Sequence, residues 1–212
     1  MNENKSSVLT NLISPAIYIS SFPFELESTD VFPISRKEQI DSCQNKEIKA
    51  QKFFAWKLLE YALKENGLDI KDFSFECVSG HWQCKDFCFS ISHSDSIVVV
   101  AIDNIPIGVD IEKKERMPKH SNFTDKISHP NETKNNDMEF SRLWTRKESA
   151  FKKNNLAKFT PSSIDTTAGN YVEFTVSFKG NNYSLCVAIE NKKDLKVVSI
   201  QEDLSITKRN TC

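Results

Sequence analysis

The chain has 212 residues, of which 39% are hydrophobic and 27% are charged, and its formal net charge is −1. This balance is typical of a globular protein with a buried core, and it excludes an overall basic field of the kind that attracts nucleic acid or anionic membranes. No apolar run reaches the length of a membrane span and the first residues do not resemble a signal peptide, so we expect a cytoplasmic protein with reduced thiols.

The first predicted element is helical and covers residues 35–67. Ser35 with Glu38 predicts a capping box, Gly67 predicts the end of the helix, and a break is expected near Asn45. Four strand patterns follow, at residues 73–77, 87–92, 96–102 and 105–112. The Asp103-Asn104 pair between the last two predicts a two-residue hairpin turn.

The second part of the chain repeats this order. Residues 113–138 are polar and predict a mobile connection with one short helix, and a helix is expected over 137–153. Strand patterns then cover residues 171–178, 183–189 and 196–200. Helices followed by strands, twice over, predict an α+β fold of two pseudo-symmetric halves, 1–105 and 106–212, each with a helix packed on an antiparallel sheet.

Two acids close the apolar strand pattern at 105–112. Alternate residues of a strand share a face, so Asp110 and Glu112 are expected to project together. Two such charges repel unless a cation lies between them, and oxygen ligands without nearby His or Cys select a hard ion such as Mg²⁺. The alternative is a solvated strand end whose acids pair with Lys113 and Lys114.

The stretch Phe140–Lys153, FSRLWTRKESAFKK, places a lysine among aromatic and aliphatic residues at helical spacing. Lys147 falls inside this apolar stripe and Glu148 borders it. A desolvated ammonium is costly unless it meets an anion. The alternative is a snorkelling Lys147, with Glu148 and Lys152 as an ordinary ion pair one helical turn apart.

A further cluster surrounds the stretch FSISHSD. The strand is expected to end at Ser92, which places His93 in a turn where hydroxyl, imidazole and backbone N–H groups could cradle a phosphate; a purely structural histidine is the alternative. A zinc site of His81, Cys84, Cys88 and His93 is a less favoured alternative, because it lacks the close Cys pair usual for zinc. Carboxylates for a metal, with lysine and histidine for phosphate, suit phosphoryl-transfer chemistry.

Three motifs together resemble the signature of the 4'-phosphopantetheinyl transferase superfamily. They are SISHS, then IGVDIE at Ile107–Glu112, then WTRKESAFK at Trp144–Lys152. The length resembles the surfactin-type (Sfp-like) group, which implies a monomer of two related halves. The resemblance implies transfer of 4'-phosphopantetheine from coenzyme A, bound between the halves, to a serine of an apo carrier protein, with release of 3',5'-ADP.

The resemblance also implies roles for individual residues. Asp110, Glu112 and Glu148 would ligate Mg²⁺. Ser92 and His93 would contact phosphate oxygens, while Lys147 and Lys152 would hold the pyrophosphate or the departing nucleotide. The catalytic set would be Asp110, Glu148 and Lys152, with Glu148 or a metal-bound water as the base that activates the serine. Glu132 loosely matches an additional acid of the family.

The nucleotide end departs from the family pattern. Gly80-His81-Trp82 stands where relatives have Gly-Lys-Pro, so His81 or Lys85 would replace the lysine, and Ser90 stands where relatives often have Asn. Candidates for the coenzyme A 3'-phosphate are Lys46, Lys49 and Lys52. The nucleotide contacts are therefore expected in the first half and the metal site in the second.

The predicted partner is a helical carrier protein with an acidic surface, which a local basic patch would dock. Candidates on the connection are Lys113, Lys114, Arg116, Lys119 and Lys126. Two alternative functions use the same residues: a catalytically inactive module that binds coenzyme A or the carrier, and a Mg²⁺-dependent phosphohydrolase. Nucleic acid and membrane are not expected partners.

Overall fold

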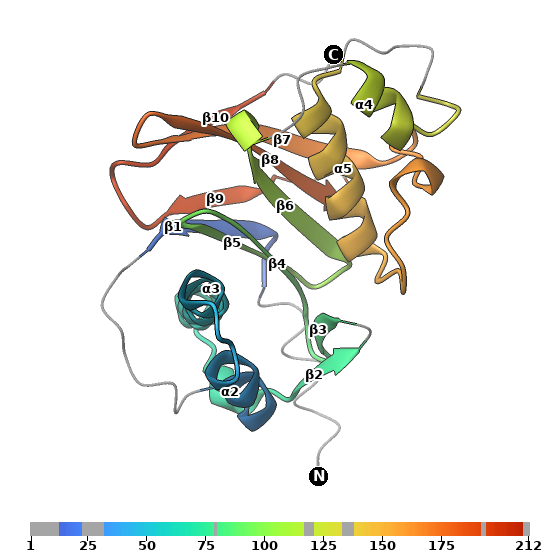
Figure 1. The fold of residues 1–212 in the computed structure, drawn as a ribbon. Coiled ribbons are helices and arrows are strands. Elements are labelled where there is room, and N and C mark those ends of the chain that lie inside the picture. The colour runs from blue at the N-terminus through green and yellow to red at the C-terminus, as the bar shows by residue number, and fades with distance from the viewer. Residues whose placement is uncertain are drawn as a thin grey trace. The chain divides into compact units, whose positions relative to one another are not determined.

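The computed structural model describes residues 13–22, 32–78, 80–116, 121–132, 138–191 and 194–209. Within them the fold is α+β, as predicted, with helices and largely antiparallel sheets (Figure 1). The chain divides into two compact units. The first contains residues 1–105 and 195–201, and the second contains residues 106–194 and 202–212. No helix among the described residues is long and apolar enough to cross a membrane.

The first unit contains the helices α2 (Ile34–Asp41) and α3 (Lys46–Glu65). Asn45 separates them as predicted, because its side chain accepts hydrogen bonds from the first backbone N–H groups of α3 and so starts a new helix. The predicted capping box at Ser35 is wrong, since α2 begins after Pro33 and has no side-chain cap. Gly67, at a φ of 72°, ends α3 as expected.

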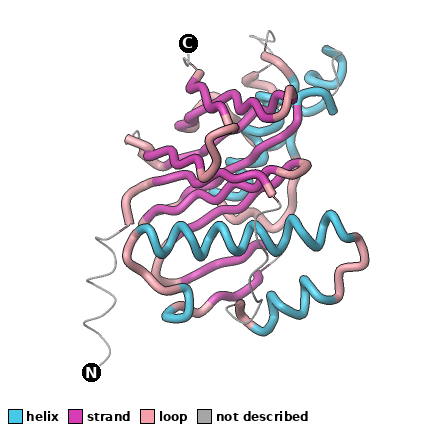
Figure 2. Tube along the Cα trace, turned by 90° about the vertical axis from the view of Figure 1, so that its left-hand side faces the viewer, coloured by secondary structure: helices cyan, strands magenta, loops and turns pink. Residues whose placement is uncertain are grey.

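The main sheet of the first unit has the order β4-β5-β1-β9. Its strands are β1 (Ala16–Ser21), β4 (Cys88–Ser94), β5 (Ile97–Asp103) and β9 (Lys196–Ser199). The apolar face of α3, including Phe54, Trp56 and Leu58, packs into the core with this sheet, and Figure 2 shows the helix lying along the strands. A separate hairpin contains β2 (Phe75–Val78) and β3 (His81–Cys84).

Two strands of this sheet were not anticipated in their places. β1 was not predicted at all, and β9 pairs with it in parallel, although residues 196–200 were expected with the second half and in an antiparallel sheet. Parallel pairing joins residues far apart in the chain, and no local turn chemistry signals it. The sheet of the first unit is therefore mixed.

The second unit has an antiparallel sheet of order β10-β7-β8-β6. Its strands are β6 (Ile107–Lys113), β7 (Asn170–Phe178), β8 (Asn181–Ile189) and β10 (Ser205–Lys208). The predicted hairpin at Asp103-Asn104 is wrong, because β5 pairs with β4 and β1 whereas β6 pairs with β8. Asp103 and Asn104 instead connect a strand of one sheet to a strand of another sheet. Turn propensity alone does not distinguish such a connection from a hairpin.

The helix α5 (Phe140–Lys153) packs on one face of this second sheet (Figure 1). Small residues line its contact face: Ser141 hydrogen-bonds Ser184 at 2.9 Å, and Ser149 bonds the Cys186 sulfur at 3.4 Å. Gly108 of β6 is required here, since a Cβ atom would lie 2.0 Å from the Ser149 carbonyl oxygen. The sequence therefore seats α5 unusually close to β6 and holds its side chains in a fixed register.

The connection between β6 and α5 contains α4 (Ser121–Ile127), which matches the one short helix expected there. Short 3₁₀ turns occur at Ile70–Asp72, Lys114–Arg116 and Pro161–Ser163. Lys119, one of the candidate docking residues, lies outside the described residues.

Candidate active site

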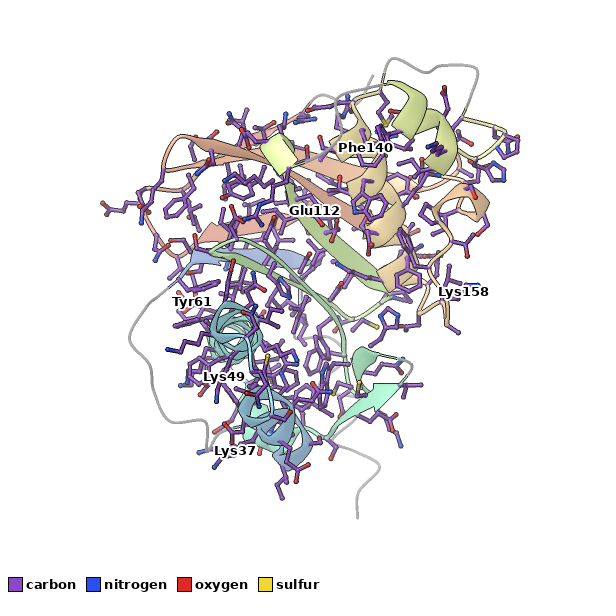
Figure 3. The ribbon with its side chains drawn as sticks, viewed as in Figure 1. Lys37, Lys49, Tyr61, Glu112, Phe140 and Lys158 are labelled. Atoms are coloured by element: carbon purple, nitrogen blue, oxygen red, sulfur yellow. The ribbon has the colours of Figure 1, made fainter. Side chains whose placement is uncertain are left out.

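Acidic side chains gather on the face of the second sheet that α5 covers. The register aligns Glu173 of β7, Cys186 of β8 and Asp110 of β6 in one row across the strands. Glu112 follows two residues later on the same face of β6, where Figure 3 labels it. Asp110 is 3% exposed and Glu112 is half-buried, so the acids lie within the structure rather than on a fraying strand end.

The helix α5 brings two functional side chains toward Asp110. Lys152 Nζ lies 2.7 Å from Asp110 Oδ1, so this lysine contacts a carboxylate of β6 as well as acting on Glu148, its neighbour one helical turn away. Burial raises the pKa of Glu148, the Lys152 ammonium lowers it, and the Asp110 carboxylate raises it further. Glu148 and Asp110 therefore repel each other, and a shared cation would relieve that repulsion.

A divalent cation fits the chemistry of these donors, because Asp110, Glu112 and Glu148 supply only carboxylate oxygens. Within the described parts of the chain, however, no three His, Cys, Asp or Glu side chains are arranged to hold a metal ion. The zinc alternative at His81, Cys84, Cys88 and His93 is thus not found. In this geometry, the positive charge beside Asp110 is the ammonium group of Lys152.

Lys147 is bound entirely inside the second unit. It is 0% exposed, and its Nζ donates to Glu132 Oε2 at 2.7 Å and to the Ile164 carbonyl at 2.6 Å. The predicted anion is present, but it is a carboxylate of the protein. The snorkelling alternative is wrong, and this geometry does not support the predicted contact of Lys147 with pyrophosphate.

Glu132 accepts several hydrogen bonds besides the one from Lys147. Its carboxylate also accepts hydrogen bonds from the Thr166 backbone N–H, the Thr166 hydroxyl and the His129 backbone N–H. Burial alone would raise the pKa of Glu132, but the hydrogen bonds from Lys147, Thr166 and His129 lower it on balance. The pair therefore ties α5 to two loops, around residues 129–132 and 164–166.

A second charged contact, which the sequence analysis missed, lies at the other end of the row. Arg142 and Arg146 each donate two hydrogen bonds to the Glu173 carboxylate, at 2.7 to 3.2 Å. Burial alone would raise the pKa of Glu173, but these guanidinium groups lower it on balance. The available signal was a glutamate at an inward position of the strand pattern YVEFTVSF.

Three of the residues predicted to contact phosphate groups, Ser92, His93 and His81, belong to the first unit. Ser92 is buried and His93 is exposed, and both lie within β4, which extends to Ser94; the turn falls instead at Asp95, with a φ of 50°. His81 is half-buried in β3. The prediction that His93 lies in the turn is therefore wrong, while its contact with phosphate stays a prediction.

The candidate lysines for the 3'-phosphate lie on α3. Lys49, labelled in Figure 3, has its Nζ 3.5 Å from the Asp41 carboxylate of α2. Lys46 is exposed and Lys52 is half-buried. Among the candidate docking residues, Lys114 pairs with Glu139 at 3.3 Å and Lys126 lies over the Phe123 ring. These positions leave the nucleotide and carrier contacts as predictions.

A cavity of about 360 Å³ is found elsewhere in the second unit. Its lining includes Lys153, Asp165, Tyr171 and Ile189, and it contains none of the three predicted metal ligands. Lys153 in turn pairs with Glu190 at 2.5 Å. The cavity is therefore not the predicted active site.

Comparison with known proteins bears on this second unit. Residues 106–207 match the family described as the 4'-phosphopantetheinyl transferase superfamily. The resemblance to this superfamily is confirmed. The matched range includes Asp110, Glu112, Glu148 and Lys152, so the acids of β6 and the helix α5 lie in the part of the chain that the superfamily shares.

One relative is the 4'-phosphopantetheinyl transferase psf-1 of Bacillus pumilus. It is 35% identical over 78 residues, which cover 33% of this chain and 33% of the relative. The match thus spans about a third of that superfamily member's length. It supports the surfactin-type resemblance, while the activity of the whole relative comes to this chain only as a proposal.

Proposed function

We propose that this protein transfers the 4'-phosphopantetheine group of coenzyme A to a serine of an apo carrier protein and releases 3',5'-ADP. The observation that carries the proposal is the arrangement of Asp110 with Glu148 and Lys152, inside the range that matches the superfamily. Fixed carboxylates and a lysine on a closely seated helix suit a reaction that depends on positioning and charge neutralisation.

Asp110, Glu112 and Glu148 are the residues that would hold Mg²⁺. When bound, the ion would neutralise the charge of the pyrophosphate. The repulsion between Asp110 and Glu148 supports a cation at this position, and Lys152 is the side chain that must then give up part of its contact with Asp110. A lysine released toward the pyrophosphate would serve as the predicted anion ligand.

The group transfer is balanced without a further reactant. The serine oxygen of the carrier forms a bond to the phosphorus nearest the pantetheine, and the bond from that phosphorus to the oxygen of 3',5'-ADP breaks. The serine proton passes to a carboxylate, for which Glu148 is the candidate, because an unactivated hydroxyl is a poor nucleophile. Ser92, His93, His81, Lys49 and Lys52 are proposed contacts for the phosphate groups.

The proposal extends to the architecture and the partner. We expect the two units to be the related halves of a monomeric surfactin-type enzyme, with nucleotide contacts in the first and the metal site in the second. An acidic helical carrier would dock on Lys113, Lys114, Arg116 and Lys126, since complementary charge favours encounter.

The test is the intact mass of apo carrier proteins incubated with coenzyme A, Mg²⁺ and the protein. We expect one carrier to gain a single phosphopantetheine group and an equal amount of 3',5'-ADP to appear. Asp110→Asn and Glu148→Gln should reduce the rate at least about 100-fold, by analogy with loss of one strong electrostatic group. Their folding, checked by circular dichroism, is the control.

Two outcomes would contradict the proposal. Release of 3',5'-ADP at the same rate without any carrier would indicate the phosphohydrolase. Binding of coenzyme A without product on any carrier of a panel from acyl, polyketide and peptide pathways would indicate the inactive module.

A further inference from the structure

Arg36 of α2 is a buried cation within the first unit. Its residue is 6% exposed, and its guanidinium carbon lies 5.3 Å from the ring centre of Trp56 and 5.7 Å from that of Trp82. The two indole rings contact each other edge to face at 5.2 Å. The charge is therefore enclosed by aromatic rings rather than by water.

The acceptors that Arg36 does have are neutral. Its Nη2 donates to the Lys52 carbonyl at 2.7 Å, and its Nη1 donates to Gln39 Oε1 at 3.1 Å. None of the salt bridges found among the described residues includes this guanidinium, and burial lowers its pKa to about 10, with the Cys77 thiol acting weakly in the opposite direction. A buried arginine is usually paired with a carboxylate or phosphate, whereas the described residues give this guanidinium no anionic partner.

Two buried donors at the same place also lack acceptors. Within the described residues, Arg36 Nε and the Trp56 indole Nε1 are enclosed and make no hydrogen bond. Buried N–H groups are nearly always bonded, and each that is not costs stability. The guanidinium and the ring that it stacks on therefore share one deficit, which a single group carrying several anionic oxygens would fill.

We propose that Arg36 and Trp56 form a binding site for the phosphate group of a small molecule. The planar guanidinium offers Nε–H and a remaining Nη–H to two oxygens in its usual forked geometry, and the indole N–H offers a third donor. A phosphate has enough oxygens for all three donors. It also supplies the negative charge that the described surroundings do not.

Access follows from the elements that cover the group. Arg36 lies on the short helix α2, and Trp82 lies on the two-stranded β2-β3 hairpin, whose residues are mostly half-buried or exposed (Figure 1). Both elements carry an exposed apolar side chain: Ile34, at the start of α2, is 79% exposed, and Val78, at the end of β2, is 44% exposed. A small displacement of the hairpin or of α2 would open the site without disturbing the four-stranded sheet.

The inference does not depend on the transfer reaction, because it rests on residues of the first unit and its test measures binding. The probe is inorganic phosphate, titrated into the full chain against chloride of equal ionic strength. We expect phosphate, and not chloride, to raise the midpoint of thermal unfolding by several degrees and to change the tryptophan fluorescence.

Arg36→Met is the informative variant. Replacing an uncompensated buried charge with an apolar side chain of similar length should leave the protein at least as stable in phosphate-free buffer. It should also abolish the response to phosphate. Lys37→Met, which removes the neighbouring charge on the same helix, should retain that response. If Arg36→Met does not fold, Arg36→Lys keeps the charge without the forked donors and should require about tenfold more phosphate.

The source of the phosphate group is distinguished by a second titration, with 3',5'-ADP. A half-maximal shift at lower concentration than for inorganic phosphate, lost in Arg36→Met, identifies a nucleotide phosphate; the reverse order identifies free phosphate, and both support the site. An equal response to phosphate and chloride in the wild-type protein, or a phosphate response that persists in Arg36→Met, would overturn the proposal.

Discussion

Lys147 and Lys152 lie on the same helix and in the same sequence motif, yet their surroundings differ sharply. Lys147 is 0% exposed and donates to both Glu132 and the Ile164 carbonyl. The Lys152 side chain is 19% exposed and contacts Asp110, next to the raised-pKa carboxylate of Glu148. One turn of α5 therefore fastens the helix, while the next holds a partly exposed ammonium group beside two carboxylates.

The two lysines differ in the carboxylate that would lose its positive partner if the lysine moved. Displacing Lys147 would leave Glu132 buried without a cation, which is strongly unfavourable. Displacing Lys152 would leave Asp110 beside a site where another cation could take its place. Under the proposed function, Lys152 is therefore the lysine that would exchange its contact for a ligand.

The largest expected effect is that of Lys147→Met. It should lower the free energy of unfolding by about 3–5 kcal/mol, because it leaves a buried carboxylate unpaired. Urea unfolding measures this loss. Lys153→Met is the matched control, since Lys153 lies on the same helix as Lys147 but pairs with Glu190, whose side chain is 54% exposed. Its effect should be much smaller. Equal losses of stability in the two variants would contradict the claim that the buried Lys147–Glu132 pair stabilises the fold more than the exposed Lys153–Glu190 pair.

Both lysines depend on the close packing of α5 against Gly108 of β6. Gly108→Ala places a Cβ atom 2.0 Å from the Ser149 carbonyl oxygen and 2.6 Å from the Lys153 backbone nitrogen. We expect a loss of about 1–3 kcal/mol in urea unfolding, because overpacking forces α5 away from β6. An unchanged stability would show that the close approach is not needed.

An effect no larger than that of Gly108→Ala is expected for Lys152→Met in buffer without divalent cations. Asp110 would lose its charged partner, and the free energy of unfolding should fall by about 1–3 kcal/mol. Under the proposed function, transfer of 4'-phosphopantetheine from coenzyme A by this variant should fall further than its stability explains. A variant with full transfer activity would show that Lys152 has only a local role.

The pH dependence of stability gives the smallest signal. The folded-state pKa of Glu132 lies below its ordinary value of 4.5, so its contribution is complete above that value and is lost as the pH falls through the folded pKa. The wild-type protein should lose up to about 1.4 kcal/mol more per pH unit than Glu132→Gln in this acidic window. Parallel curves for the two proteins would contradict the lowered pKa.

Local patterns predicted much of the second unit. Alternation along β6 placed Asp110 and Glu112 on one face, as the register of this strand shows. Helical spacing placed Lys147 in a buried stripe that needs an anion. In each case the signal is a periodicity within a few residues, where the physics is local.

Other features depend on contacts that no local pattern encodes. The partner of Lys147 is Glu132, in a turn preceded by polar residues, and the partner of Lys152 is Asp110 on another element. The Asp103-Asn104 hairpin prediction failed because turn residues do not reveal which sheet the next strand joins. The environment of Arg36 was likewise invisible, since its lack of an anionic partner among the described residues appears only when the surrounding rings are placed.

The most direct test of the metal site is a Mg²⁺ titration of thermal unfolding, monitored by circular dichroism. The account predicts that Mg²⁺ raises the midpoint of the wild-type protein, raises that of Lys152→Met by more because the competing ammonium is gone, and leaves that of Asp110→Asn unchanged. An equal rise in all three proteins would contradict the assignment of Asp110, Glu112 and Glu148 as the metal ligands.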